Sequence, residues 1–147
     1  MMRYFLLLAF VLLGGCQSGF ATSDYGSLPH TKNDVTFQAE SEISPSEQGV
    51  RFYIINAGEE AVYYDMGYEI EKEVDGTWKS VPFEDKPSFR ERDRKVNPGE
   101  SFESAVLLEE LEAAFKDGVY RVIVTTAMER DTEKEFMLAS EFEVTSS

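Results

Sequence analysis

The chain has 147 residues, enough for one domain with a single hydrophobic core but short for two domains. Its 28 acidic residues against 14 basic ones give a net charge of −14 at pH 7, which argues against nucleic acid and anionic lipid headgroups as partners. One cysteine and one histidine exclude an internal disulfide and disfavour both a His/Cys metal site and a nucleophile–histidine catalytic arrangement.

Residues 1–15 have the pattern of an export signal. Arg3 is followed by ten apolar residues, Tyr4 to Leu13, and by two glycines before Cys16. An early cation, a short apolar stretch and small residues at the cleavage site are the parts of a signal peptide. An apolar helix of that length is about 15 Å long, too short for a hydrocarbon core of roughly 30 Å. We therefore expect the segment to be removed.

The end of this segment, Leu13, Gly14, Gly15 and Cys16, resembles the bacterial lipobox. The resemblance implies that Cys16 receives a diacylglyceryl group and becomes the new N-terminus on the extracytoplasmic face of the cell membrane. Since an unpaired thiol is a liability in an exported protein, its consumption by a lipid fits a chain with one cysteine. An ordinary secretion signal followed by a chance cysteine is the alternative. Loss of Arg3 leaves 13 basic residues against 28 acidic ones, a net charge of −15.

Residues 16–33 are predicted to form a flexible tether. The stretch from Gln17 to Asn33 is rich in Ser, Gly and Thr and has no apolar period of either kind. As a coil it would reach about 25 Å from the bilayer. His30 lies in this stretch, where nothing would hold it in a fixed geometry. The folded domain is then expected over residues 34–147.

Period-two alternation predicts antiparallel strands in the first half of this domain. The side chains expected in the core are Val35, Phe37, Ala39, Val50, Phe52, Ile54, Tyr68 and Ile70. In the long stretch from Tyr63 to Val74, the residues expected to face solvent are Glu69, Glu71 and Glu73. Asp75-Gly76 predicts a tight hairpin turn into residues 77–81, because both residues tolerate positive φ.

In the second half, residues 82–95 hold two prolines and dense mixed charge, which predicts a loop. Asn97-Pro98-Gly99 predicts a turn, and Leu108, Leu111 and Phe115 have the spacing of a short helix. The core residues expected from three further strands are Phe102, Ser104, Val106, Tyr120, Val122, Val124, Phe136, Leu138, Phe142 and Val144. About seven strands and one short helix favour an all-β sandwich.

The order of these patterns resembles a family of bacterial immunoglobulin-like domains of exported proteins and lipoproteins. The matching stretches are GVRFYIIN, GYEIEKEVDGTWKSV, NPGES and KDGVYRVIV, within residues 35–144. The resemblance implies an Ig-like antiparallel β-sandwich, no enzymatic activity and no established ligand. It also implies that Tyr120 is a tyrosine corner, and that Trp78 packs in the core or at an edge rather than stacking on a ligand.

A looser resemblance, confined to Pro98-Gly99-Glu100 and residues 118–122, is to a bacterial protease-inhibitor family of similar fold. It implies an alternative function, inhibition of extracytoplasmic proteases, with residues 82–95 as the inhibitory loop. The basic residues of that loop, Arg90, Arg92, Arg94 and Lys95, alternate with acidic ones. We interpret them as a self-neutralising group, with docking to an acidic partner as the alternative.

No set of residues predicts catalysis, a metal or a cofactor. No calcium-binding DxDxDG loop is present. The acidic groups Glu109, Glu110, Glu112 and Asp131, Glu133, Glu135 are interpreted as solvated faces, with a weak cation site as the alternative for the second group. We therefore expect a protein that is not an enzyme, a carboxylate-based hydrolase being the distant alternative.

The alternation also predicts a docking face on the outer side of the last two strands. It directs away from the core the side chains of Val119, Arg121, Ile123, Met137, Ala139 and Glu141. The strand with Glu69 and Glu71 would lie beside them, so that one of these carboxylates pairs with Arg121. An apolar outer face on so acidic a chain is typical of an interaction site, here for a protein or an envelope polymer. The alternative is that the tether or the charged loop folds over this face.

Overall fold

The computed structural model describes residues 20–43, 48–82, 94–107, 116–128 and 135–145. Within these ranges the regular structure consists of strands alone. In chain order they are β1 (Thr31–Lys32), β2 (Val35–Ile43), β3 (Gln48–Asn56), β4 (Val62–Val74), β5 (Thr77–Ser80), β6 (Arg94–Val96), β7 (Ser101–Leu107), β8 (Gly118–Ala127) and β9 (Glu135–Val144).

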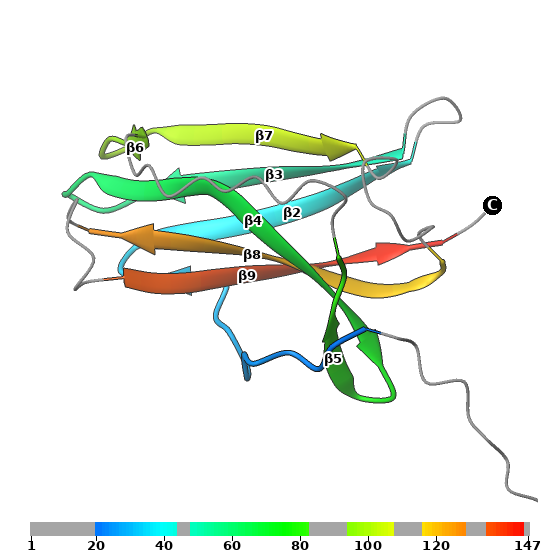
Figure 1. Ribbon diagram of the computed structural model, residues 1–147. Coiled ribbons are helices and arrows are strands. Elements are labelled where there is room, and N and C mark those ends of the chain that lie inside the picture. The colour runs from blue at the N-terminus through cyan, green and yellow to red at the C-terminus, as the bar shows by residue number, and fades with distance from the viewer. Residues whose placement is uncertain (1–19, 44–47, 83–93, 108–115, 129–134, 146–147) are drawn as a thin grey trace, which may run out of the picture.

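The strands form two antiparallel sheets that pack as a sandwich (Figure 1). The first, which we call the β3 sheet, has the order β1-β2-β3-β7. The second, the β8 sheet, has the order β5-β4-β8-β9, and β6 pairs with the other end of β4. The predicted all-β sandwich is therefore confirmed.

Alternation along the strands builds the core, as the sequence predicts. Inward side chains of β2 and β3 meet those of β8 and β9, and the predicted residues that are buried include Val35, Phe37, Val50, Phe52, Ile54, Ile70, Tyr120, Val122, Val124, Phe136, Leu138, Phe142 and Val144. Aromatic rings fill much of the space between the sheets. The Phe37 and Phe52 ring centroids lie 5.7 Å apart, and those of Tyr120 and Phe142 lie 5.6 Å apart.

Two predicted turns are present. Asp75 and Gly76 have φ angles of 52° and 74° and connect β4 to β5, as expected for a two-residue hairpin. Gly99, at φ 77°, lies in the turn before β7. A residue with a Cβ would be strained at either glycine, which explains why glycine stands there.

The strand count and one loop boundary differ from the sequence prediction. The described residues form nine strands rather than about seven, because β1 and β6 are too short to show alternation. Arg94 and Lys95, predicted in a loop, begin β6 and pair with Tyr64 and Tyr63 of β4. The predicted short helix and most of the predicted charged loop, residues 108–115 and 83–93, lie outside the described residues, as do Glu109, Glu110, Glu112, Asp131 and Glu133.

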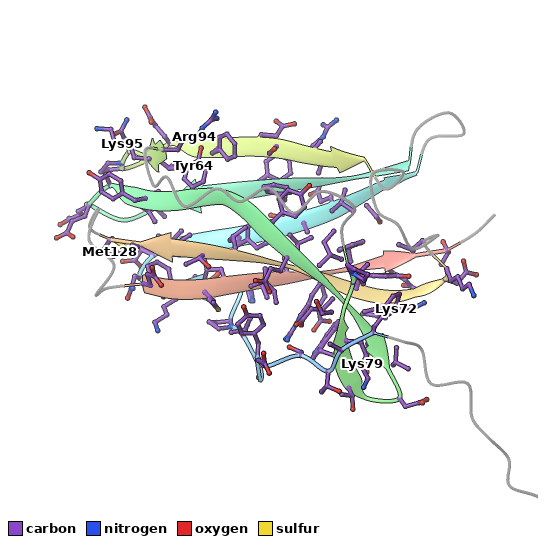
Figure 2. All side chains as sticks on the ribbon, in the orientation of Figure 1. Tyr64, Lys72, Lys79, Arg94, Lys95 and Met128 are labelled. Carbon is purple, nitrogen blue, oxygen red and sulfur yellow. The ribbon has the colours of Figure 1, made fainter. Side chains whose placement is uncertain are left out.

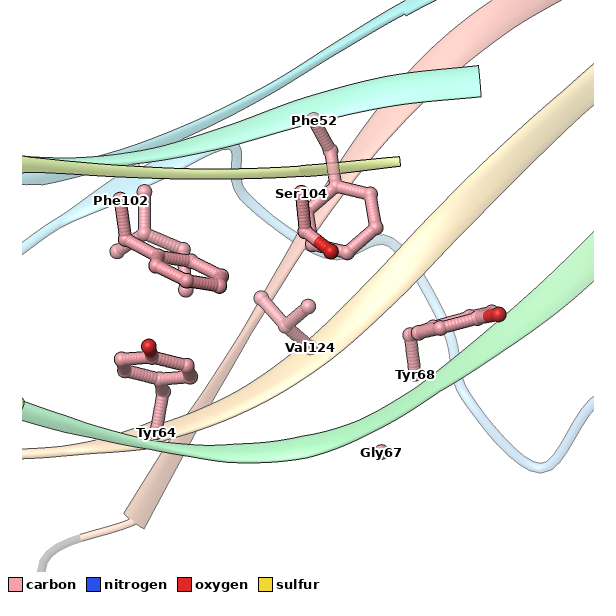
Figure 3. Close-up of a pocket in the computed structure, with 8 residues that line it drawn as sticks. Phe52, Tyr64, Gly67, Tyr68, Phe102, Ser104 and Val124 are labelled. Carbon is pink, nitrogen blue, oxygen red and sulfur yellow. The ribbon is translucent and has the colours of Figure 1, made fainter. Parts of the chain in front are cut away.

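The described part of the sandwich has a small cavity between its two sheets. At the side where β4 faces β7, a bulge between Tyr64 and Tyr68 leaves a cavity of about 20 Å³ (Figure 3). Its lining includes Phe102, Ser104 and Val124. A cavity of this size holds one water molecule. This cavity has no room for an organic ligand.

Candidate functional site

The segment of residues 20–30, which we call the strap, lies on the outer side of the β8 sheet. Its first residues act as an additional strand along β5: the Ser80 amide donates to the Ala21 carbonyl, and the Ser23 amide donates to the Trp78 carbonyl, both at 2.9 Å. The ammonium group of Lys79 (Figure 2) also donates to Thr22 Oγ1, at 2.7 Å. The outer edge of β5 is thus paired with the N-terminal part of the same chain.

The middle of the strap is held by Arg121 of β8. The guanidinium donates from Nη1 to the Gly26 carbonyl at 3.0 Å, and its Nη2 lies 3.5 Å from Ser23 Oγ and from the Tyr25 carbonyl. The Tyr25 hydroxyl donates to Glu69 Oε1 at 3.1 Å. These contacts fix the strap across the sheet at the position of β8 and β4.

The far end of the strap closes the opposite edge of the sandwich. The Ala139 amide of β9 donates to the Pro29 carbonyl at 3.0 Å, and the Phe37 amide of β2 donates to the His30 carbonyl at 2.8 Å. The chain then enters β1, which pairs with β2. One short segment therefore spans the outer face of the β8 sheet from edge to edge.

Beneath the strap lies a buried ion pair. Arg121 and Glu71 are direct cross-strand neighbours on β8 and β4, and the guanidinium contacts Glu71 Oε2 from Nε at 2.7 Å and from Nη2 at 2.6 Å. Only 3% of the Arg121 side chain and 2% of the Glu71 side chain are exposed. The Trp78 ring centroid lies 4.5 Å from Arg121 Cζ, a cation–π distance. Carboxylate, strap carbonyls and indole together replace the water that the guanidinium loses.

The pKa of Tyr25 is shifted by its burial and by the carboxylates near the strap. Burial raises its pKa to about 12, and the carboxylate of Glu69 at its hydroxyl acts in the same direction. The phenol is therefore neutral at physiological pH and acts as a donor to Glu69. The acceptor carries a negative charge, but at 3.1 Å and exposed to solvent this hydrogen bond is longer and weaker than most charge-assisted O–H···O⁻ bonds.

The prediction that the docking face is exposed to solvent is wrong. Arg121, Ile123 and Ala139 are 3%, 2% and 6% exposed, and Val119 and Met137 are half-buried. The predicted alternative, that the tether folds over this face, is the arrangement observed. Residues 20–33, predicted to be tether, are therefore part of the folded domain. The prediction that Glu69 or Glu71 pairs with Arg121 is confirmed for Glu71, but Glu71 lies under the strap and not in solvent.

Comparison with known protein families now identifies the fold. The family model described as a bacterial Ig-like domain matches residues 31–143, which is most of the chain. The chain belongs to the bacterial Ig-like domain family. The match begins at β1, so the strap precedes the part of this Ig-like chain that the family model covers.

Solved structures similar to this Ig-like domain are distant in sequence. The archaellum periplasmic stator protein FlaG from Sulfolobus acidocaldarius is 14% identical over 75% of this chain and 99% of its own, with a TM-score of 0.40. The archaellum periplasmic stator complex of FlaF and FlaG from the same organism is 15% identical over 83% of this chain and 99% of its own, with a TM-score of 0.40. The Northeast Structural Genomics Consortium target SoR45 is 18% identical over 76% of this chain and 83% of its own, with a TM-score of 0.39. No curated protein matches the chain. Likeness at this level concerns the fold alone.

Two aromatic residues of the Ig-like domain have the positions that the family resemblance implies. The Tyr120 hydroxyl donates to the Lys116 carbonyl at 2.7 Å, which confirms the tyrosine corner. Burial raises the Tyr120 pKa, and the Lys72 ammonium lies 5.1 Å from the ring centroid. Trp78 is half-buried at the β5 edge and covers Arg121, so it is an edge residue and not part of the core.

The described residues include no candidate metal site. His30 is exposed, and no group of three or more His, Cys, Asp and Glu side chains in the described ranges could hold a metal ion. Within the same ranges, no helix is long and apolar enough to cross a membrane. Of the four basic loop residues, Arg94 and Lys95 are exposed on β6 (Figure 2), and a hydrogen bond from Arg94 partly opposes the rise that burial causes in the Tyr64 pKa.

Proposed function

We propose that this Ig-like protein is a lipoprotein of the cell envelope, anchored through Cys16, whose domain is non-catalytic and acts by binding another envelope component. The observation that carries the proposal is the strap. It begins at Phe20, four residues after the proposed lipid acceptor, and is hydrogen-bonded to β5 from Ala21 onward. The N-terminal anchor would thus be continuous with the folded domain rather than separated from it by a long coil.

The strap sets how close the domain lies to the bilayer. Four residues span at most about 14 Å when fully extended. The end of the domain that holds Ala21, β5 and the Asp75-Gly76 turn must then lie next to the membrane surface. β7 lies on the side of the molecule away from this hairpin (Figure 1). The β3 sheet is therefore the part of the domain that faces away from the membrane.

The anchor is tested by the substitution Cys16→Ala, with Ser18→Ala as the matched control. We expect the Cys16 variant to lose labelling by a radioactive fatty acid and either to remain unprocessed or to be shed into the medium. The Ser18 variant should behave as wild type. Normal processing and full membrane retention of the Cys16 variant would refute the lipid anchor.

The short connection is tested separately by measuring distance from the bilayer. A spin label is placed at Asp75→Cys or at Glu103→Cys in the lipidated protein, reconstituted in nanodiscs that contain a nickel-chelating lipid. We expect much stronger relaxation by nickel at position 75 than at position 103. A flexible insertion of about 20 residues after Cys16 should remove the difference, since such a coil reaches roughly 25 Å. Equal relaxation without the insertion would contradict the proposed orientation.

A further inference from the structure

The edge strands of the two sheets differ in whether another segment of the chain pairs with them. A sheet edge has unpaired backbone N–H and C=O groups and is a template for another strand. The strap pairs with β5 and bonds to β9, and β1 covers β2. β6, three residues long, and β7, seven residues long, also lie at edges, and within the described ranges β7 pairs with β3 on one side and with no strand on the other.

The register between β3 and β7 shows which backbone groups point out of the sheet. The Asn56 amide donates to the Glu100 carbonyl at 3.0 Å, which makes this pair a hydrogen-bonded one. Hydrogen-bonded and non-hydrogen-bonded pairs alternate along an antiparallel ladder. Phe102 and Ser104, opposite Ile54 and Phe52, therefore direct their backbone groups toward β3. The backbone groups of Ser101, Glu103 and Ala105 point outward.

The side chains on this edge are compatible with an added strand. Ser101, Glu103 and Ala105 are exposed on the outer face, and two of them are small. The Glu103 carboxylate lies 3.3 Å from Arg51 Nε, but 56% of its side chain remains exposed. Ile55, in the neighbouring strand β3, is a large apolar side chain that is exposed to solvent. An extended segment next to β7 would meet outward backbone donors and acceptors and one carboxylate.

We propose that the outer edge of β7 binds an extended basic segment of another envelope protein by strand addition, with a Lys or Arg opposite Glu103. Backbone hydrogen bonds to Ser101, Glu103 and Ala105 supply the affinity in this mode, and alternate side chains supply the selectivity. A net charge of −14 repels a second copy of the chain and attracts a basic segment. Opposite charges across a strand pair stabilise it, and like charges destabilise it.

This inference rests on the binding role proposed above, but not on the lipid anchor. If the Cys16 variant were retained and processed normally, the edge would still be testable. Conversely, failure at β7 would leave the lipid labelling result unchanged. The two experiments therefore fail independently.

The test measures amide hydrogen exchange by NMR on the full mature chain in detergent micelles, with a synthetic nine-residue peptide of alternating lysine and valine as the probe. The amides of Ser101, Glu103 and Ala105 should slow by about tenfold or more with peptide. Those of Phe102 and Ser104 should not change, because they already bond to β3. A peptide of alternating glutamate and valine is the charge control and should have no effect.

Variants separate strand addition from general charge attraction. Ala105→Pro removes one outward donor without removing a bond to β3, a substitution that edge strands tolerate. We expect peptide affinity to fall about tenfold or more, whereas Ala105→Thr, which keeps the amide, should bind as wild type. Should Ala105→Pro fail to fold, Glu103→Lys keeps every backbone donor and should weaken binding of the lysine peptide, because like charges would then face each other across the strand pair.

Three results would overturn the proposal. The first is no slowing of the three outward amides at about 1 mM peptide, a concentration that would detect binding as weak as roughly 4 kcal/mol. The second is equal peptide affinity of wild type and folded Ala105→Pro. The third is slowing of the same amides with protein concentration alone, together with a dimer in sedimentation, since the occupant would then be a second copy of this chain.

Discussion

The two sheets of this domain each carry a cross-strand ion pair on the outer side, and the pairs differ in their access to water. On the β8 sheet, Arg121 and Glu71 lie beneath the strap with 3% and 2% of their side chains exposed. On the β3 sheet, Arg51 and Glu103 are 3.3 Å apart with 39% and 56% exposed. The same chemistry thus occurs in two solvent environments within one molecule.

The comparison shows what covering a sheet does to a charge pair. In water, the gain from an ion pair is small because solvent screens it and both side chains lose freedom. Under the strap, the pair is strong only as a unit, because either charge left alone would be desolvated without compensation. The strap and the ion pair therefore depend on each other: the strap excludes water from Arg121, and Arg121 holds the strap.

The largest expected effect breaks the buried pair on one side. Arg121→Ala leaves the Glu71 carboxylate buried without its partner and frees the middle of the strap, and we expect a loss of about 3–5 kcal/mol in the free energy of unfolding. Arg51→Ala is the matched control on the β3 sheet and should cost less than about 1 kcal/mol. Urea denaturation of both variants measures the difference. Similar losses would mean that the strap does not keep water from Arg121.

A double variant sharpens this result. Arg121→Met with Glu71→Leu removes both charges and keeps the volume apolar, so global stability should return to within about 2 kcal/mol of wild type. The strap, however, would still lack its bond from Arg121 to the Gly26 carbonyl. We therefore expect the Ser23 and Ser80 amides to exchange faster than in wild type, although the sheets remain intact.

The sandwich could be predicted from the sequence because alternation records which side of a strand is buried. Val35, Phe37 and Ala39 on β2, and Tyr120, Val122 and Val124 on β8, all lie where period two directs them. The Asp75-Gly76 turn was also predictable, since few residues accept positive φ. Local backbone chemistry and a binary pattern are both present in the residues themselves.

The strap could not be predicted in the same way. It binds mainly through the carbonyls of Ala21, Gly26, Pro29 and His30, which any residue could supply, so its sequence has neither apolar period nor motif. One signal was available on the other partner. β8 is apolar on both faces around Arg121, and continuous apolar strands are typical of sheets covered on both sides. A cation in such a strand indicates a buried partner rather than a docking surface.

A smaller effect is expected from the cover over the guanidinium. Trp78→Ala removes the cation–π contact and opens the edge between the strap and β5, which should cost about 1–2 kcal/mol. Phe37→Ala, a truncation in the filled core, is the comparison and should cost about 3–5 kcal/mol. Chemical denaturation would measure both. If Trp78→Ala cost as much as Phe37→Ala, the indole would have to be counted as core.

The smallest effect concerns the pH dependence of the strap. Tyr25 has a pKa of about 12 in the folded chain against an ordinary value near 10, because burial and Glu69 both disfavour the tyrosinate. A group whose folded pKa is raised binds its proton more tightly in the folded state, so its contribution is complete below pH 10 and is lost as pH rises from 10 to 12.

Tyr25→Phe isolates this contribution from that of other tyrosines, including Tyr64 and Tyr120, whose pKa values are also raised. At pH 8 the variant should be less stable than wild type by about 0.5 kcal/mol, the lower end for one hydrogen bond, because it lacks the bond to Glu69. Between pH 10 and 12 this difference should shrink and then change sign, since ionised Tyr25 would repel Glu69 while Phe does not. Urea denaturation of both chains across this range measures the difference directly. A difference that stays constant from pH 8 to 12 would show that the Tyr25 hydroxyl does not bond to Glu69, and that Arg121 alone fixes the middle of the strap.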